Sequence, residues 1–416
     1  MSREMKHSGI PWIGDIPKGW NIENIGSCLK EVHNLNSDCS EDNALQFKMG
    51  TIISKKHGDS KYNPETLEAY NKVQVGDIVI NGLNLSFDFI SMRVGQVKEN
   101  GVITSAYLTV RPLSHLDSDY VTYLFKGYDA CKALHGMGKG LRQTLSYKEF
   151  RKYLIFHPSL SEQKKIASFL DRKCAEIDEM IALQEKIVEE LKAYKQSVIT
   201  EAVTKGLNPD VPMKDSGIEW IGKTPEHWEF RHLKRSYTFE KGKNAAQYTQ
   251  DYIGEHNGVF PVYSGQTEND GIMGSIDSYE YDIEECLFTT TVGARVMTPK
   301  ILKGRFSLSQ NCLIMHKKDD EICNEFIFYL LHPLFAYEKS LIPSYMQPSL
   351  RVEDLKTYAF YIPSLFEQKQ IAEILNAKCT KIDNLISIKL SKIDSLKEYK
   401  KSIIYEYVTG KKEVIE

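Results

Sequence analysis

A glycine-rich loop carries the residues with the clearest potential for chemistry. Residues 135–143 contain three glycines beside Lys139, Arg142 and Gln143. Glycines let backbone N–H groups approach a phosphate closely, and arginine and glutamine side chains form paired hydrogen bonds with guanine and adenine edges. This combination predicts contacts with DNA. The alternative interpretation is a solvated surface loop that binds nothing.

A second loop occupies the matching place in the other half of the chain. It spans residues 344–349 and contains Tyr345 and Gln347. With an offset of 205 residues, Gln347 takes the position that Arg142 has in the first loop. Arginine and glutamine favour different bases. The two loops therefore predict two different half-sites in one DNA target.

Further polar side chains follow predicted strands and turns in both halves. They are Asn84 and Arg93 in the first half, and Lys241, Lys243, Arg295 and Gln310 in the second half. Such side chains contact phosphates and base edges in protein–DNA complexes. Any single one of them, taken alone, is more often a solvated surface residue.

The remaining motifs argue against catalysis and against metal or nucleotide binding. Residues 217–224 match the phosphate-loop pattern, but no apolar strand precedes them and Pro225 stands where a helix should begin. The eight cysteines form no Cys-x-x-Cys pair and no zinc-like spacing with histidines, so we expect no metal ligands. The chain has no Asn/Asp-Pro-Pro-Tyr/Phe element of amino-methyltransferases and no nucleophile elbow. We expect a non-catalytic chain without a cofactor of its own.

The composition is that of a globular protein with nearly balanced charge. Of 416 residues, 53 are basic and 56 acidic, which gives a formal net charge of −3. DNA binders usually carry a basic excess, so we expect partner subunits to supply part of the phosphate neutralisation. No apolar run of about 18 residues occurs, and residues 1–7 lack the apolar core of a signal peptide. We expect a cytoplasmic protein with no membrane span.

Two long helices must hold the loops, and both begin with the same motif. Pro-Ser-Leu-x-Glu-Gln starts at Pro158 and again at Pro363, and each copy contains a capping box, Ser-x-x-Glu. Apolar residues then recur at heptad spacing, which predicts a coiled-coil seam along helices about 60 Å long. The predicted seam positions are Leu170, Ile177, Ile181, Gln184, Val188 and Leu191, and Leu375, Ile382, Ile386, Lys389, Ile393 and Leu396.

Polar residues interrupt the two seams at matched positions. Gln184 matches Lys389, and Lys195 matches Lys400. A polar residue on a seam weakens packing but fixes register and orientation. We expect the two helices to pack on each other in antiparallel fashion. The alternative is that each helix packs only on its own domain.

A second pair of blocks marks the start of each half. Ser-Gly-Ile-x-Trp-Ile-Gly, followed by a proline and a tryptophan, begins at Ser8 and again at Ser216. Such a duplication predicts a pseudo-twofold molecule. Strands are expected at residues 77–80, 107–110, 285–289 and 312–315. The predicted fold class is α+β, with two pseudo-repeated mixed α/β domains separated by two long antiparallel coiled-coil helices.

These duplicated motifs resemble those of the specificity subunit of type I DNA restriction–modification systems. The resemblance covers the whole chain, and both motifs occur twice in the same order. It implies that residues 1–157 and 206–362 are two target-recognition domains, each of which reads one part of a split DNA target. It also implies that residues 158–205 and 363–416 are the spacer helices, the second with a tail.

The resemblance implies partners as well. In this family the subunit binds double-stranded DNA and two methyltransferase subunits, which use S-adenosylmethionine to methylate adenine N6. Separate restriction and translocase subunits use ATP and Mg²⁺. None of these activities and none of these cofactors is expected on this chain.

Two other interpretations stay open at this point. The chain is either the specificity subunit of a single-partner or fused methyltransferase–nuclease system, or a protein-interaction scaffold with no role on DNA. Neighbouring genes distinguish the first alternative. Salt-sensitive DNA binding distinguishes the second.

Overall fold

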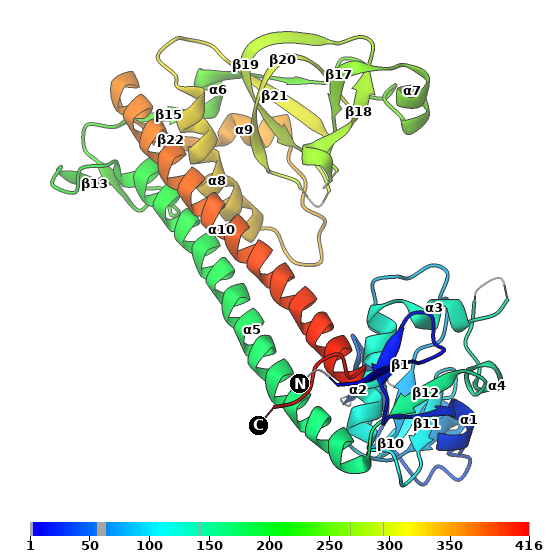
Figure 1. Cartoon of the computed structure of the whole chain (residues 1–416). Helices are drawn as coiled ribbons and strands as arrows, with labels where there is room; N and C mark the ends of the chain where they lie inside the picture. The colour runs from blue at the N-terminus through cyan, green and yellow to red at the C-terminus, as the bar shows by residue number, and fades with distance from the viewer. Residues whose placement is uncertain (1–2, 56–63, 141–142, 267, 294, 416) are drawn as a thin grey trace. The chain divides into compact units, whose positions relative to one another are not determined.

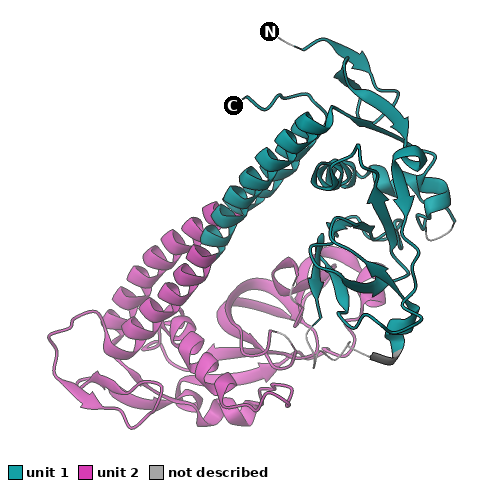
Figure 2. Ribbon diagram, turned by 90° about the horizontal axis from the view of Figure 1, so that it is seen from below, with its two compact units in different colours: residues 1–185, 391–416 teal, residues 186–390 magenta. Residues whose placement is uncertain are grey.

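The chain folds into two compact units (Figure 2). Unit 1 contains residues 1–185 and 391–416, and unit 2 contains residues 186–390. Both boundaries lie inside two long helices, α5 (Leu160–Lys205) and α10 (Leu365–Val408). Each unit therefore consists of one mixed domain and a part of both helices. The structure, a computed structural model, describes residues 3–55, 64–140, 143–266, 268–293 and 295–415.

Helices α5 and α10 run antiparallel beside each other within each unit (Figures 1 and 2). In unit 1 the Lys400 ammonium lies 2.6 Å from the Asp178 carboxylate, and in unit 2 Lys195 lies 2.7 Å from Asp383. The offset of 205 residues turns Asp178 and Lys195 into Asp383 and Lys400. The two ion pairs therefore use equivalent residues, and the helix that supplies the lysine in one supplies the aspartate in the other. An isologous twofold contact has the same reciprocal pattern. The predicted antiparallel pairing is confirmed.

The predicted seam positions are shielded from solvent. Buried among them are Leu170, Ile177, Gln184, Val188, Leu375, Ile382 and Ile393. Half-buried are Ile181, Leu191, Ile386, Lys389 and Leu396. The amide oxygen of Gln184 has no hydrogen-bond partner within the described part of the chain. Cys174 and Cys379, at matched positions, are buried as small core residues.

Each long helix begins directly after its predicted N-cap serine. The Ser159 hydroxyl accepts from the Glu162 N–H and the Ser364 hydroxyl from the Glu367 N–H, both at 3.4 Å. The glutamate carboxylates bind the N-terminal blocks instead, since Glu162 accepts from Arg3 and Glu367 accepts from the Trp228 indole. In the described residues, only the serine half of each predicted capping box forms.

Unit 1 carries a domain of short strands and helices. Its four-stranded antiparallel sheet has the order β4-β11-β8-β9, and the other strands pair as β1–β2, β3–β12, β7–β10 and β5–β6. The elements are β1 (Met5–His7), β2 (Asp15–Pro17), β3 (Asn21–Asn24), α1 (Ile25–Cys28), β4 (Leu29–Glu31), β5 (Leu45–Lys48), β6 (Thr51–Ser54), η1 (Pro64–Ala69), β7 (Tyr70–Val73), β8 (Ile78–Ile80), β9 (Val94–Gln96), β10 (Gly101–Thr104), β11 (Leu108–Pro112), α2 (Ser118–Ala130), α3 (Ala133–Met137), α4 (Tyr147–Phe150) and β12 (Leu154–His157).

The core of unit 1 joins this domain to both long helices. Apolar residues of β8 and α2 pack with Leu170 from α5 and with Ile403 and Val408 from α10. The Tyr120 hydroxyl on α2 donates to the Val408 carbonyl oxygen at 3.1 Å. The end of the second repeat's helix therefore completes the core of the first domain.

Unit 2 is built on a larger sheet. Six strands have the order β16-β21-β19-β20-β17-β18, and separate pairs form between β13 and β14 and between β15 and β22. The elements are β13 (Met213–Asp215), β14 (Lys223–Pro225), β15 (Glu229–His232), α6 (Leu233–Ser236), β16 (Tyr237–Lys241), α7 (Gln250–Glu255), β17 (Asn257–Tyr263), η2 (Asn269–Gly271), β18 (Ile272–Ile276), β19 (Tyr281–Thr290), β20 (Pro299–Leu308), β21 (Cys312–Lys317), α8 (Asn324–Ser340), α9 (Val352–Thr357) and β22 (Ala359–Ile362).

The same frame recurs in both units, whereas the inserted strands differ. The β1–β2 and β13–β14 hairpins match, as do the β3–β12 and β15–β22 pairs. Residues 217–224 include the turn between β13 and β14, with Gly217 and Gly222 both at φ +65°. This segment is a hairpin turn, and it lacks the strand-to-helix geometry of a phosphate loop.

Candidate nucleic-acid interface

Two predicted segments of unit 1 lie side by side although they are distant in the sequence. The loop after β8 and the loop before α4 exchange backbone hydrogen bonds. The Leu145 N–H donates to the Gly82 carbonyl oxygen at 2.9 Å, and the Leu85 N–H donates to the Gln143 carbonyl oxygen at 3.2 Å. The first loop thus anchors the glycine-rich loop at the end of a buried strand. We call these segments, residues 81–93, 137–140 and 143–145, the unit 1 loop pair.

Three of the predicted contact residues are exposed on the unit 1 loop pair. Asn84 and Gln143 both adopt left-handed backbone angles, with φ of 52° and 45°. Lys139 forms an ion pair with Glu149 at 2.8 Å, and this hydrogen bond raises the pKa of Lys139. Arg142, the main predicted base contact of this unit, lies outside the described residues.

Arg93 has a different role from the predicted one. Its side chain is 1% exposed, and its guanidinium donates to the carbonyl oxygens of Asn81, Leu83 and Asp88 at 3.0, 2.9 and 2.6 Å. The five N–H donors of arginine suit this clustering of carbonyl groups. Arg93 therefore organises the loop from inside, and the prediction that it contacts DNA is wrong for this conformation.

The first loop also exposes apolar side chains that the sequence analysis did not single out. Phe87 is 77% exposed and Ile90 is 90% exposed, while Phe89 stacks on His135 at 4.7 Å between ring centroids. Exposed apolar residues on a loop next to a glycine-rich segment can contact thymine methyl groups or insert between base steps. The detectable signal was the run Phe-Asp-Phe-Ile directly after a polar turn.

Three segments of unit 2 meet at one residue, Thr291. Its N–H donates to the Asn311 carbonyl oxygen at 2.8 Å, and its carbonyl oxygen accepts from the Leu350 N–H at 2.8 Å. An isolated β-bridge between Val292 and Ser349 lies beside these bonds. The end of β19, the β20–β21 turn and the loop before α9 are therefore held together. We call residues 290–293, 295–296, 309–311 and 341–350 the unit 2 loop cluster.

The unit 2 loop cluster presents most of the residues predicted for this half. Tyr345 is 87% exposed, Gln347 and Gln310 are also exposed, and Arg295 is half-buried. Lys241 is the last residue of strand β16 and pairs with Leu313 near the start of β21, and Lys243 follows two residues later. The Lys243 ammonium lies 4.7 Å from the centre of the Tyr281 ring. Cationic, amide and aromatic side chains thus gather at one edge of the sheet.

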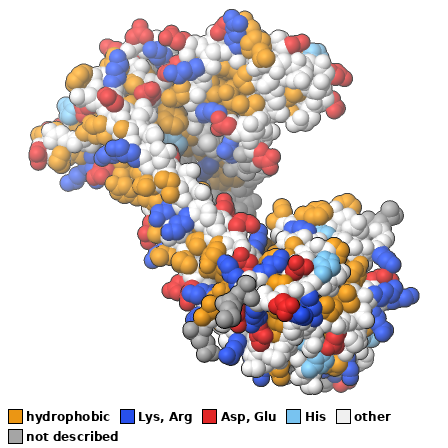
Figure 3. All heavy atoms as spheres, viewed as in Figure 1, with side chains coloured by type: hydrophobic (Ala, Val, Ile, Leu, Met, Phe, Trp, Pro, Cys, Tyr) orange, Lys and Arg blue, Asp and Glu red, His pale blue; other side chains and the backbone are white. Residues whose placement is uncertain are grey.

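Charge is dispersed on the face drawn in Figure 3, where basic, acidic and apolar side chains intermingle. Many basic groups form ion pairs, such as Lys300 with Asp270 and Arg305 with Asp282. This agrees with the nearly balanced composition. Such a surface favours DNA contacts by a few positioned side chains over general attraction of DNA to a broad basic patch.

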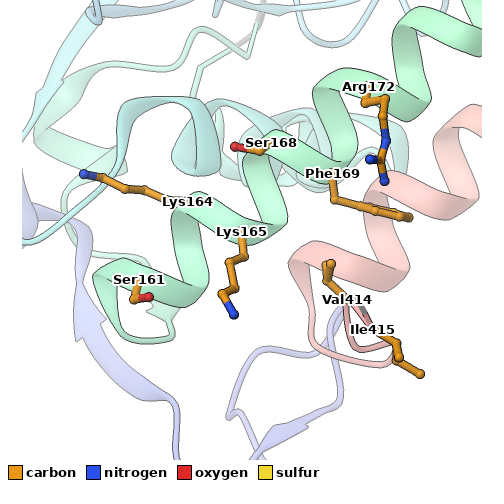
Figure 4. Close-up of a pocket in the computed structure, with 8 residues that line it drawn as sticks. All are labelled: Ser161, Lys164, Lys165, Ser168, Phe169, Arg172, Val414 and Ile415. Carbon is orange, nitrogen blue, oxygen red and sulfur yellow. The ribbon is translucent and has the colours of Figure 1, made fainter.

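A groove of about 660 Å³ lies beside the first turns of α5 (Figure 4). Lys164, Lys165 and Arg172 from α5 border it together with Val414 and Ile415 from the tail. The positions of Lys165 and Arg172 on α5 correspond to Gln370 and Ala377 on α10. The first turns of α5 therefore carry two basic side chains that the matching turns of α10 lack.

A buried glutamine in each unit braces the domain against its long helix. The Gln163 side chain accepts from the Asp117 N–H at 2.7 Å and donates to the His115 and Pro158 carbonyl oxygens. Gln368 makes the matching bonds to Cys323, Glu321 and Pro363. The sequence showed both glutamines as part of the repeated motif, but their bracing role needed the structure.

Comparisons with known proteins agree on one family. Residues 225–398 match the family model of the type I restriction modification DNA specificity domain. The type I restriction enzyme MjaVIII specificity subunit of Methanocaldococcus jannaschii is 24% identical over 96% of the chain and 94% of that protein. The MpnII specificity subunit of Mycoplasma pneumoniae is 33% identical over 31% of the chain and 38% of that protein.

A solved structure shares the fold over nearly the whole length. It comes from a study of complex assembly and conformational transition of the type I R-M system, and it covers 95% of this chain and 99% of that chain. The TM-score is 0.71 at 14% sequence identity. Within the described residues, no helix is both long and apolar enough to cross a membrane.

Proposed function

We propose that the chain is a specificity subunit of the type I restriction–modification family, and from that premise that it reads a bipartite, asymmetric DNA target without catalysing a reaction. Each unit would read one part of the target. The unit 1 loop pair and the unit 2 loop cluster are the proposed reading surfaces. The sequence between the two parts would stay unread.

One observation carries this proposal. The two units repeat the same frame, yet they present different side chains at the matching loops, with Gln143 in unit 1 and Tyr345 and Gln347 in unit 2. Two units with the same strand pairs but different loop side chains are suited to recognise two different DNA sequences. Side chains that pair with base edges specify sequence, whereas phosphate contacts set position.

The partners are part of the proposal. We propose that two methyltransferase subunits bind this chain and methylate adenine in both parts of the target, using their own S-adenosylmethionine. Restriction and translocase subunits with ATP and Mg²⁺ would join the same complex. The formal net charge of −3 supports this arrangement, because a near-neutral chain neutralises few phosphates by itself.

Base-modification sequencing tests the proposal. Cells that express this chain with its methyltransferase should show adenine methylation in both parts of one split motif with a fixed gap. The methylation should disappear when this gene is deleted. An active methyltransferase without any such motif would contradict the proposal and leave the interpretation as a protein scaffold.

Loop substitutions assign the two half-sites. Gln347→Ala should relax one position in one half of the motif and leave the other half unchanged. Gln143→Ala should do the same in the opposite half. Lys18 directly follows β2, is exposed and lies outside both sets of loops, so it serves as the control, and Lys18→Ala should leave the motif unchanged. A change in both halves from either loop variant would contradict the assignment.

A further inference from the structure

Three side chains from distant segments of unit 1 converge beside the start of α5. Glu23 lies on β3, His157 lies at the end of β12, and His115 lies in the connection between β11 and α2. One oxygen or nitrogen donor atom of each residue lies within 4.8 Å of the other two. No metal ligands were expected from the spacing of cysteines and histidines, and Glu23 and His157 lie 134 residues apart in the chain, so no local pattern joins them.

The fold itself places these groups together. In the β3–β12 pair Glu23 stands opposite Ile155, so His157, two residues further on, is a diagonal neighbour on the same face. The connection that carries His115 is fixed by Gln163, which donates to the His115 carbonyl oxygen at 3.1 Å. The cluster is therefore built on a strand pair and on the buried brace of α5.

Oxygen atoms lie next to both ring nitrogens of His157, an arrangement that favours a bound cation. This residue is 4% exposed. Its Nε2 lies 3.0 Å from a carboxylate oxygen of Glu23, and its Nδ1 lies 3.0 Å from the Pro158 carbonyl oxygen and 3.5 Å from the Gln163 amide nitrogen. Both ring nitrogens thus face oxygen acceptors, although a neutral imidazole has one N–H to donate. A proton or a metal ion between His157 and Glu23 resolves this mismatch.

A second imidazole favours the metal ion. The Nε2 of His115 lies 3.8 Å from the other carboxylate oxygen of Glu23. In a tetrahedral zinc site with bonds of about 2.0–2.1 Å, neighbouring donor atoms are about 3.3 Å apart. The His157 and His115 nitrogens lie 3.0 and 3.8 Å from the two different oxygens of the Glu23 carboxylate, and one donor atom of each of the three residues lies within 4.8 Å of the others, so a small movement of the side chains brings them to that spacing. The His115 side chain is 43% exposed, so it has room to rotate toward the ion.

We propose that Glu23, His115 and His157 bind one divalent transition-metal ion of the zinc class. Two imidazoles and a carboxylate form a donor set that such ions prefer. The carbonyl oxygen of Pro158 at Nδ1 supplies the outer contact that orients a metal-bound imidazole. The exposed side of the cluster leaves the fourth position to water. The ion would link the β3–β12 strand pair to the connection before α2, so its role would be structural.

Unit 2 provides an internal comparison. The bonds of Gln368 to the Glu321 carbonyl oxygen show that Glu321 takes the place of His115, and the repeat offsets give Arg231 for Glu23 and Ile362 for His157. Arg231 and Glu321 form an ion pair at 3.3 Å. Unit 2 thus carries a fixed positive charge where unit 1 has metal ligands. We expect one ion per chain.

Calorimetric titration of the full chain with ZnCl₂ tests the proposal, and it needs no DNA. The unaltered chain should bind one Zn²⁺ in its tightest phase, and His115→Ala should weaken that phase at least about 10-fold. The matched control is His7→Ala, because His7 is an exposed histidine that, within the described residues, forms an ion pair with a single carboxylate, Asp15. Equal Zn²⁺ binding by the unaltered chain and His115→Ala would overturn the proposal, as would the absence of any such phase.

A ligand replacement separates direct coordination from a structural effect at residue 115. His115→Cys keeps a zinc-binding side chain, so it should restore Zn²⁺ binding. With Co²⁺ this variant alone should gain the near-ultraviolet absorption of a thiolate–cobalt bond. If the absorption does not appear in the folded variant, residue 115 is not a ligand. Neither result alters the proposal for DNA reading, which base-modification sequencing tests separately.

Discussion

At the scale of single residues, the Gln163 side chain connects the start of α5 to the segment before α2. It is fully buried and makes hydrogen bonds to three backbone groups. Gln163→Leu would leave these groups unpaired, and each buried unpaired group costs about 1–3 kcal/mol. We expect the midpoint of urea unfolding to fall clearly. The exposed Gln347→Leu is the control and should unfold like the unaltered chain.

Arg93 and Gln143 should respond to substitution in different ways. Arg93→Ala removes the donors that hold three carbonyl groups, so it should lower the free energy of unfolding by more than about 1 kcal/mol and reduce methylation of all target sequences. Gln143→Ala should leave stability unchanged and cost about 1–3 kcal/mol of discrimination at one base pair. Urea unfolding and base-modification sequencing measure the two effects. A single relaxed base position in Arg93→Ala would contradict the loop-organising role.

His332 on α8 makes unit 2 sensitive to acid. Burial, with a smaller effect of the Lys195 charge, lowers the pKa of His332 to about 4, whereas an unfolded histidine titrates near 6.5. Its contribution to stability is complete above about pH 6.5 and disappears as the pH falls to about 4. The loss amounts to about 3 kcal/mol at most.

His332→Gln removes this titration. Urea unfolding at pH 7 and at pH 4.5 should show a smaller loss of stability for His332→Gln than for the unaltered chain. His33→Gln, at an exposed histidine of unit 1, should keep the original pH dependence. Identical pH dependence in all three proteins would refute the assignment to His332.

At the scale of elements, the two ion pairs between α5 and α10 fix the helix register. Lys195 and Asp383 are partly exposed, so their interaction should contribute about 0.2–1 kcal/mol. Lys195→Asp should destabilise unit 2, and adding Asp383→Lys should recover most of the loss. A double-mutant cycle measures the coupling, which should shrink as salt rises. The matching cycle on Asp178 and Lys400 should give a similar value in unit 1, and no coupling in either would contradict the register.

The elements differed in how far the sequence could predict them. The starts of both long helices were predicted to within two residues, because the N-cap serines and the heptad spacing that follows them are local signals. The ion pairs were not predicted, since Lys195 and Lys400 were interpreted as polar seam interruptions. The convergence at Thr291 and the Glu23–His115–His157 cluster depend on hydrogen bonds between remote segments. No local pattern encodes such contacts.

At the scale of the whole molecule, the paired helices should set the length of the unread gap. A seven-residue insertion after residue 185, matched by one after residue 390, preserves the heptad phase and the antiparallel register. It lengthens each helix by about 10 Å, which corresponds to about three base pairs of DNA. Base-modification sequencing should report the same two half-sites with a longer gap. Altered half-sites with an unchanged gap would contradict a spacer role.

Unit 1 is built from two separate stretches of the chain, so its two parts leave the ribosome at different times. Unit 2 is one continuous stretch, residues 186–390, whereas unit 1 needs its last segment, residues 391–416. Ile403, Ile404 and Val408 belong to the core of unit 1. At about 5–20 residues per second, the ribosome completes that core roughly 10–45 seconds after the rest of the first domain has been made. The domain made first is therefore the last to become complete, and a chain released before its final helical turns leaves that domain's apolar core open to the cell's proteases.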